Sequence, residues 1–167
     1  MDAIFVAMRH LHFIGVGGMG MGTLAGIMLA KGCKVSGSDL RESQLTVDLK
    51  RKGARIHIGH AAQNLDHPDC VIYSSAVKPD NPEIKAAKQK KIPVKKRAEL
   101  LAQLVNEQIG ITVAGAHGKT TTTAMIAHVL LKAGLDPTTM IGGVMKDSSY
   151  NAHVGSGKYF VLEYRCG

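Results

Sequence analysis

Apolar and polar positions alternate along the chain in blocks that predict strands and helices in turn. Short apolar runs bounded by glycine or polar residues are typical of buried strands, and the stretches between them have helical spacing. Near the middle of the chain, one apolar helical stripe is formed by Leu100, Leu101, Leu104 and Val105. The predicted strands are 11–16, 33–39, 54–59, 69–76 and 92–96, and the predicted helices are 17–32, 43–53, 81–91 and 98–108.

The same alternation restarts after residue 108, which predicts a second unit. Residues 110–114 predict a strand, 120–134 a helix that ends at Gly134, and 137–144 and 158–163 two further strands. Repeated strand and helix predict parallel α/β architecture. We therefore expect a Rossmann-like, parallel-sheet domain at residues 1–108, followed by the first part of a P-loop α/β domain at residues 109–167. The amphipathic helix around 98–107 is the expected seam.

A G-x-G-x-x-G motif lies between the first predicted strand and the first predicted helix. Its glycines, Gly15, Gly17 and Gly20, suit a tight turn, a close approach of backbone to pyrophosphate, and close helix–strand packing. The helix N-terminus that follows favours an anion. Asp39 ends the second predicted strand, where an acid can take a ribose hydroxyl. On this motif alone the ligand would be NAD or NADP, and glycines that serve only packing are the alternative.

A second glycine loop follows the strand at 110–114 and reads Gly115-Ala116-His117-Gly118-Lys119-Thr120. The usual P-loop has a glycine where this chain has Val113. The chemical parts remain, because backbone N–H groups can cradle phosphate, Lys119 can reach the outer phosphates and the Thr120 hydroxyl can ligate Mg²⁺. A helix capped by threonines, with an incidental lysine, is the alternative. Two phosphate loops fit an ATP-driven ligase with a nucleotide-linked substrate better than a dehydrogenase.

Composition and charge narrow the class of partner. The net charge is +8, and much of it lies in the basic run 85–97, which we interpret as a solvated rim. Aromatic residues make up only 4% of the chain, so no stacking platform supports nucleic-acid binding. No apolar run approaches the roughly 20 residues of a membrane span, and the start, from either Met1 or Met8, does not resemble a signal peptide. Three scattered cysteines fit a reducing cytosol.

Several segments, taken in order, resemble the Mur ligases. They are HFIGVGGMGMGTLA, VSGSD, IGH, SSAV, DNPEI, RAELLAQL, VAGAHGKTTTTAMIAHVL and IGGV. The resemblance runs from about Leu11 to Glu163, and it explains the shortened loop, because the family's ATP loop reads Gly-Thr/Ala-His/Asn-Gly-Lys-Thr.

The resemblance implies an ATP-dependent ligase of peptidoglycan biosynthesis. A muramic acid carboxylate attacks the γ-phosphate of ATP, an acyl phosphate forms, and an amino group displaces the phosphate to give an amide. The implied cofactors are ATP and Mg²⁺, and the implied substrates are UDP-N-acetylmuramate and L-alanine. The family member that reattaches recycled murein tripeptide is the alternative. We expect a cytoplasmic protein without nucleic-acid or membrane partners, and its oligomeric state is not indicated.

The resemblance also implies roles for individual residues. Lys119, Thr120 and Glu163 are the expected catalytic residues, and Thr120 and Glu163 hold Mg²⁺. For His60, a surface or core-edge histidine is the alternative. The expected ATP-binding residues are Gly115, Ala116, His117, Gly118, Lys119, Thr120 and Thr121. The expected UDP-sugar-binding residues are Gly15, Gly17, Gly18, Met19, Gly20, Asp39, His60, Ser74 and Ser75.

The last four residues depart from the family pattern. The family continues after its glutamate with an Ala-Asp-Glu-Ser-like stretch, the rest of the ATPase domain and a C-terminal domain, whereas this sequence reads Tyr164-Arg165-Cys166-Gly167. An expression boundary, a frameshift and a natural short form are all open. We expect this chain to be inactive alone and strands such as 158–163 to be exposed edges. A non-catalytic UDP-sugar-binding module is the alternative, and a dinucleotide- or nucleic-acid-binding protein is a distant third.

Overall fold

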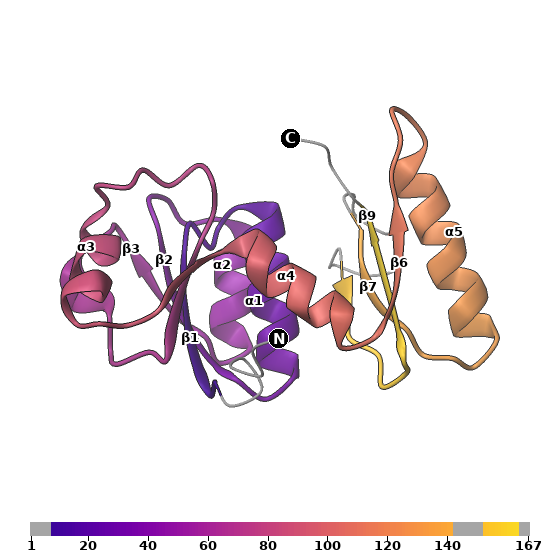
Figure 1. Cartoon of the computed structure of the whole chain (residues 1–167), viewed down its shortest axis with the longest axis horizontal. Coiled ribbons are helices and arrows are strands. Elements are labelled where there is room, and N and C mark those ends of the chain that lie inside the picture. The colour runs from indigo at the N-terminus through magenta and orange to yellow at the C-terminus, as the bar shows by residue number, and fades with distance from the viewer. Residues whose placement is uncertain (1–7, 142–151, 164–167) are drawn as a thin grey trace. The chain divides into compact units, whose positions relative to one another are not determined.

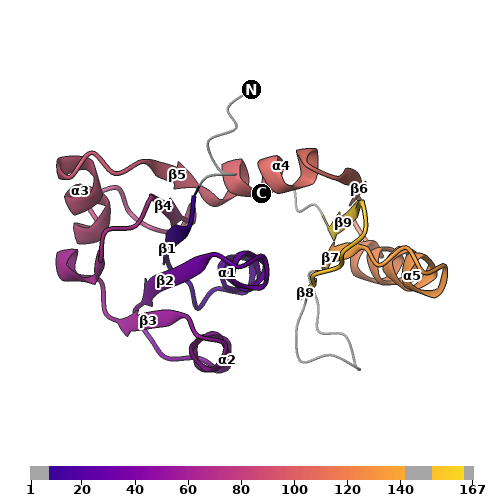
Figure 2. The same ribbon diagram turned by 90° about the horizontal axis from the view of Figure 1, so that it is seen from below.

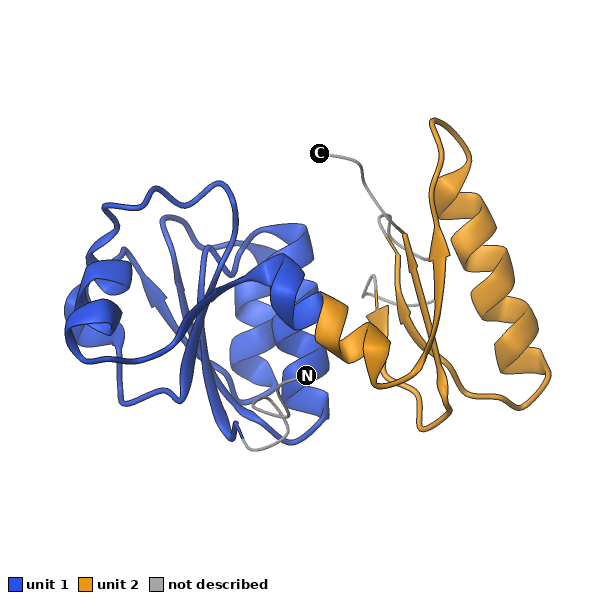
Figure 3. Ribbon diagram, in the orientation of Figure 1, with its two compact units in different colours: residues 1–101 blue, residues 102–167 orange. Residues whose placement is uncertain are grey.

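The computed structural model describes residues 8–141 and 152–163. The chain divides into two compact units, residues 1–101 and 102–167 (Figure 3). The division falls inside the helix that we expect at the seam, somewhat before the predicted boundary at residue 108.

The first unit contains a five-stranded sheet in which every strand pair is parallel (Figure 1). The strand order is β3-β2-β1-β4-β5 (Figure 2). Helices α1 and α2 cover one face of this sheet and α3 covers the other (Figure 2). Because both faces are covered, β1 is buried along its whole length. This confirms the predicted parallel α/β fold. The strands are β1 His10–Ile14, β2 Lys34–Asp39, β3 Arg55–Ile58, β4 Cys70–Tyr73 and β5 Val94–Lys96. The helices are α1 Met19–Ala30, α2 Gln44–Arg51, the 3₁₀ helix η2 Ala62–Asn64, α3 Pro82–Gln89 and α4 Arg97–Asn106.

The strand order creates a switch point between β1 and β4. The chain runs outward from β1 through β2 to β3 on one side, and then crosses to β4 and β5 on the other side. In open parallel sheets, ligands bind at the carboxyl edge beside such a point. The loops that follow β1 and β4 therefore flank the expected ligand crevice.

The local chemistry of the helix ends agrees with the sequence. Asn81 caps α3 by accepting a hydrogen bond of 2.9 Å from the N–H of Glu83, and Pro82 occupies the first helical position. Ser43 and Thr46 form a reciprocal capping box at the start of α2. These caps fix where each helix begins relative to the preceding strand. The short helix η2 is not among the predicted elements.

The second unit contains a four-stranded sheet with the order β6-β9-β7-β8. Strands β6, β9 and β7 are parallel, while β8 is antiparallel to β7. Helix α5 packs on this sheet. The predicted strand at 137–144 is described only up to residue 141, and β8 is not among the predicted elements. The elements are β6 Ile109–Val113, α5 Lys119–Lys132, β7 Thr138–Met140, β8 Ala152–His153 and β9 Tyr159–Glu163.

The expectation that residues 158–163 form an exposed edge is wrong. Strand β9 pairs with β6 on one side and with β7 on the other. Phe160, Val161 and Leu162 are buried in consequence. Among the described strands of this sheet, β6 is instead an edge, and its Ile109 side chain is exposed. No helix in the described residues is long and apolar enough to cross a membrane.

Candidate functional site

The first glycine loop is held by the end of β2. Gly15 has a φ of 79°, which a residue without a side chain adopts at little cost, and its N–H donates to the Ser38 carbonyl at 2.8 Å. The Gly17 N–H donates to Asp39 Oδ2, also at 2.8 Å. Helix α1 then begins without a side-chain cap. The hydrogen bonds to Ser38 and Asp39 thus hold the loop against the end of β2, and the N-terminus of α1 is directed at the carboxyl edge of the sheet.

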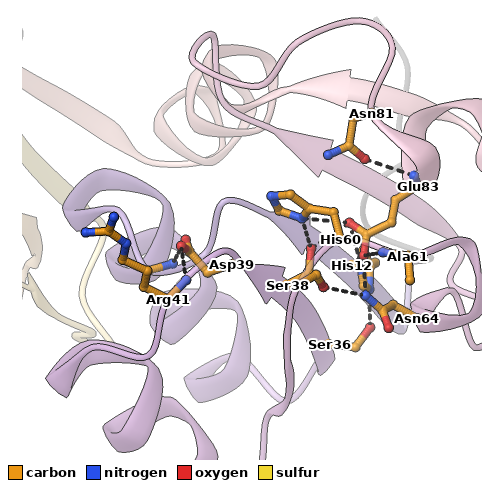
Figure 4. A network of polar contacts seen from close by, with 12 residues as sticks. His12, Ser36, Ser38, Asp39, Arg41, His60, Ala61, Asn64, Asn81 and Glu83 are labelled. Atoms are coloured by element: carbon orange, nitrogen blue, oxygen red, sulfur yellow. Dashed lines mark hydrogen bonds and ion pairs between the residues drawn. The ribbon is translucent and has the colours of Figure 1, made fainter.

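Asp39 holds the first glycine loop through its contact with Gly17. It also lies at the end of β2, where we expect the ribose. Besides the Gly17 contact, its Oδ1 accepts a 3.3 Å hydrogen bond from the Arg41 N–H (Figure 4). A Cβ atom at Gly17 would lie 2.8 Å from Asp39 Oδ2. A side chain at position 17 would therefore displace the Asp39 carboxylate from this contact, and a role of Asp39 in ribose binding stays a prediction.

Ser74 faces the glycine loop across the switch point. It directly follows β4, and a Cβ atom at Gly15 would lie 3.6 Å from Ser74 Oγ. Ser75 is the next residue of the same turn and is exposed. Gly18 and Met19 are exposed at the start of α1. The structure thus brings the predicted loop residues and Ser74 together at one edge of the sheet.

Arg97 is a candidate that the sequence reading missed. Its guanidinium lies so close to Gly20 that a Cβ atom at this position would overlap it. Within the described residues, no hydrogen bond or ion pair joins Arg97 to a neighbour. Arg97 ends the basic run that we interpreted as a solvated rim, yet it is half-buried beside the expected pyrophosphate loop. The available signal was its place in the segment RAELLAQL, which carries part of the family resemblance.

His60 belongs to a second group of polar residues, on the α3 side of the sheet. Its Nδ1 lies 2.9 Å from Ser38 Oγ and 3.5 Å from Glu83 Oε2 (Figure 4). Glu83 is fully buried and also accepts hydrogen bonds from Ser38 Oγ and Asn64 Nδ2, both at 2.5 Å, and from the Ala61 N–H at 3.3 Å. This group contacts His60 at Nδ1, whereas Asp39 contacts Gly17 in the glycine loop before α1.

The buried carboxylate of Glu83 is ionised. Burial by itself would raise its pKa, but the contacts from His12, Ser38 and Asn64 outweigh burial, so the pKa of Glu83 lies below its ordinary value. His12 is also fully buried, and its Nε2 lies 3.6 Å from Glu83 Oε2 without a hydrogen-bond partner in the described residues. The sequence did not point to Glu83, because a glutamate in a helix is usually exposed.

The second glycine loop surrounds a hollow of about 280 Å³ at the carboxyl edge of the second sheet. Gly118 has a φ of 73° and precedes the first residue of α5. The side chain of Lys119 turns back onto the loop, where Nζ donates to the Gly115 carbonyl at 2.6 Å and to that of Ala116 at 3.4 Å. The lining consists of Ala116, His117, Gly118, Lys119, Thr120, Thr121 and Glu163.

Thr120 and Glu163, the pair expected to hold Mg²⁺, are in direct contact. Strands β6 and β9 are neighbours, and residues Val113 and Glu163 pair at their carboxyl ends. Thr120 Oγ1 donates to Glu163 Oε2 at 2.9 Å. The described residues contain no cluster of three or more metal-ligating side chains. A hydroxyl and one carboxylate nevertheless suit Mg²⁺, which usually takes one or two carboxylates together with substrate phosphates and water.

Comparisons with known proteins agree on one family. The family described as "Mur ligase family, catalytic domain" matches residues 10–109. The UDP-N-acetylmuramate–L-alanine ligase of Persephonella marina is 52% identical over 155 residues, which are 93% of this chain and 34% of that protein. The enzyme of the same name from Aquifex aeolicus is 54% identical with the same coverage. The chain therefore spans about a third of the length of the curated relatives it matches.

Solved structures give the same result. The UDP-N-acetylmuramate-alanine ligase from Thermotoga maritima is similar with a TM-score of 0.84 and 37% identity, covering 92% of this chain and 36% of that one. A murein peptide ligase from Psychrobacter arcticus is similar with a TM-score of 0.85 and 29% identity, covering 93% of this chain and 37% of that one.

Proposed function

Since this chain belongs to the Mur ligase family, we propose that it carries the two nucleotide-binding loops of a UDP-N-acetylmuramate–L-alanine ligase. The observation that carries the proposal is the pair of phosphate loops, each placed between a parallel strand and a helix N-terminus. Among the solved structures, the alanine ligase from Thermotoga maritima is 37% identical to the chain and the Psychrobacter arcticus murein peptide ligase is 29% identical. The tripeptide-recycling activity is therefore the second candidate.

In the first unit, the ligand is UDP-N-acetylmuramate. The loop from Gly15 to Gly20 holds the pyrophosphate at the N-terminus of α1, and the Arg97 guanidinium neutralises part of its charge. The side chains at the ends of the strands take the rest of the ligand. Asp39 and His60 lie on the nucleoside side of the loop, and Ser74 and Ser75 lie across the switch point.

In the second unit, the ligand is ATP. The amides of the loop from Gly115 to Gly118 cradle the phosphates, and the Lys119 ammonium exchanges the loop carbonyls for phosphate oxygens. Thr120 and Glu163 hold Mg²⁺, which when bound offsets the negative charge of the phosphate oxygens. The chain thus positions a phosphoryl group and stabilises its charge, which is how proteins accelerate phosphoryl transfer.

The wider context follows from the same proposal. The second substrate is L-alanine, whose amino group forms the amide. A cytoplasmic location is supported by Cys33 and Cys70, which are free thiols. The proposal requires neither a nucleic acid nor a membrane partner.

The ATP half of the proposal is tested by replacing the loop lysine. We expect Lys119→Met to weaken binding of Mg-ATP by roughly 10- to 100-fold, because a charge-assisted hydrogen bond contributes about 1.5–3 kcal/mol. Lys132→Met, in the last turn of the same helix, is the matched control and should leave affinity unchanged. Isothermal titration of the three proteins measures this. Equal ATP affinity for the wild type and Lys119→Met would contradict the proposed role of the loop.

The choice of ligase is tested by phosphate release. The 167-residue chain is incubated with UDP-N-acetylmuramate and Mg-ATP, and then with either L-alanine or murein tripeptide. Release that depends on L-alanine would support the ligase proposal, and release that depends on tripeptide would favour the recycling activity. Binding of the UDP-sugar without release in either mixture would agree with the expectation that this chain is inactive alone, and the UDP-sugar-binding module would then describe what it does by itself.

A further inference from the structure

The buried Glu83 carboxylate, which lies next to His60, is the acceptor in each of its hydrogen bonds. Glu83 is ionised and has no exposed surface, so each of its neighbours must donate. The Asn64 amide and the Ala61 N–H contact its Oε1, and the Ser38 hydroxyl contacts its Oε2. These contacts determine where the hydrogens of the group lie.

The hydrogen count assigns the tautomer of the neutral His60 ring. A serine hydroxyl has one hydrogen, and Ser38 gives it to Glu83 at 2.5 Å. Ser38 Oγ can then only accept from His60 Nδ1, which lies 2.9 Å away. The second group near Nδ1 is Glu83 Oε2 at 3.5 Å, and it is also an acceptor. Both neighbours therefore require a hydrogen on Nδ1, which leaves Nε2 of the neutral ring as a hydrogen-bond acceptor.

The acceptor lies where a ligand can reach it. His60 follows β3 and the turn at Gly59, at the same carboxyl edge of the sheet as the glycine loop. Its side chain is 15% exposed, whereas Glu83 is buried. Figure 4 shows the ring facing Ser38 and Glu83 with one edge, so that its other nitrogen is turned away from them.

We propose that Glu83 and Ser38 are positioning residues, which hold His60 in the Nδ1–H form so that Nε2 accepts a hydrogen bond from the nucleoside of the bound UDP-sugar. This inference rests on the proposed function for the identity of the ligand. A uridine offers such donors at the N3–H of the base and at the ribose hydroxyls. A histidine in the Nε2–H form would instead present a donor, which would meet the N3–H of uracil unfavourably.

The tautomer is tested on the wild-type chain without any ligand. Long-range ¹H–¹⁵N correlation spectra distinguish the Nδ1–H from the Nε2–H form, and the signal that is lost in His60→Gln identifies His60. We expect the neutral ring to be in the Nδ1–H form. We expect Glu83→Gln to shift His60 toward the Nε2–H form, because the new amide can donate to Ser38 and free the Ser38 hydrogen for Nδ1. Ser38→Ala leaves Glu83 Oε2 as an acceptor near Nδ1 and should shift His60 less. Glu42→Gln, at an exposed glutamate of the same unit, should leave the His60 spectrum unchanged. An Nε2–H form in the folded wild type would overturn the inference.

The ligand part is tested by titration with UDP and three analogues. We expect Ser38→Ala, which keeps the Asn64 and Ala61 contacts of Glu83, to weaken UDP binding roughly three- to tenfold. N3-methyl-UDP, 2′-deoxy-UDP and 3′-deoxy-UDP distinguish the three donors, because only the analogue that lacks the relevant donor should bind the wild type as weakly as UDP binds Ser38→Ala. Unchanged UDP affinity in Ser38→Ala would overturn this part. Failure of the wild type to bind UDP would instead overturn the proposed function. The tautomer of His60 would still be decided by the spectra, which need no ligand.

Discussion

At the scale of single residues, Arg97 is a cation placed where its own helix disfavours it. It is the first residue of α4, and a positive charge in the first turn of a helix is unfavourable by roughly 0.3–1 kcal/mol. Its guanidinium also lies against the start of α1, beside Gly20. The N-termini of α1 and α4 and the Arg97 guanidinium together give a region of positive electrostatic potential. A bound pyrophosphate would neutralise part of this charge.

We therefore predict that Arg97→Ala weakens binding of UDP-N-acetylmuramate by about 10- to 100-fold, because a charge-assisted hydrogen bond is removed. Lys96→Ala removes a neighbouring exposed cation and serves as the control. Calorimetric titration at two salt concentrations measures both. An equal loss of affinity in the two variants would show that Arg97 acts only through the general positive field.

Asp136 provides a pH-dependent test in the second unit. Hydrogen bonds from His153 at 2.8 Å and from the N–H and hydroxyl of Ser156 lower the pKa of Asp136 from 3.8 to about 2. A lowered pKa in the folded state means that the ionised form stabilises the fold. This stabilisation is complete above 3.8 and is lost as the pH falls through about 2.

We predict that Asp136→Asn lowers the melting temperature at neutral pH, and that the difference from the wild type narrows as the pH falls below 3.8. Asp80→Asn, at an exposed position of the first unit, is the control. Thermal unfolding followed by circular dichroism across this pH range measures the difference. A constant difference at all pH values would contradict the linkage.

The residues of the glycine loops are easier to predict from the sequence than residues whose surroundings depend on how distant elements pack. Lys119, Thr120 and the glycines could be predicted, because phosphate chemistry needs those residues at that spacing. Glu83 could not be predicted, and Arg97 only from its place in the segment RAELLAQL, because the surroundings of both depend on which helix packs beside which loop. A glutamate or an arginine in a helix carries no sign in the sequence of being buried or of facing another element.

At the scale of elements, α1 is shaped by the glycines along it. A Cβ atom at Gly22 would overlap the Leu45 side chain and lie 2.7 Å from the Val16 carbonyl oxygen. At Gly26 the nearest atom to such a Cβ is Leu49 Cδ2, at 3.8 Å, which is an ordinary contact. Gly22 thus allows α1 to pack closely against Val16 of the glycine loop and Leu45 of α2, whereas Gly26 is not needed for a close contact.

The two positions should respond oppositely to alanine. We predict that Gly26→Ala stabilises the first unit by roughly 0.5–1 kcal/mol, because glycine within a helix costs about that much relative to alanine. Gly22→Ala should destabilise it by about 1–3 kcal/mol through overpacking. Urea unfolding of both variants measures the free energy of unfolding. Destabilisation by Gly26→Ala, or none by Gly22→Ala, would contradict the packing described for α1.

The regular elements of the first unit followed from the sequence because each has its own signal. The buried strands have apolar runs, and α3 has Pro82 after its capping Asn81. The two-residue strand β8 and the short η2 are held by neighbours distant in sequence, and hydrophobic periodicity cannot reveal them. The pairing of β9 on both sides was missed for the same reason, because strand order depends on the whole sheet.

At the scale of the whole molecule, the chain combines two units that each place a glycine loop between a strand and a helix N-terminus. A dinucleotide enzyme needs only the first loop. The second loop, with Lys119 and the Thr120–Glu163 pair, explains why the ligand of the first loop is proposed to be a UDP-sugar rather than NAD. The central claim is therefore the identity of the ligand in the first unit.

Calorimetric titration of the 167-residue chain with UDP-N-acetylmuramate tests this claim most directly, with NADH as the comparison ligand and circular dichroism to establish that the chain is folded. We predict saturable binding with a Kd in the micromolar range, equivalent to about −8 kcal/mol, and no heat with NADH. A folded chain that binds NADH, or that gives no binding heat with the UDP-sugar, would contradict the account.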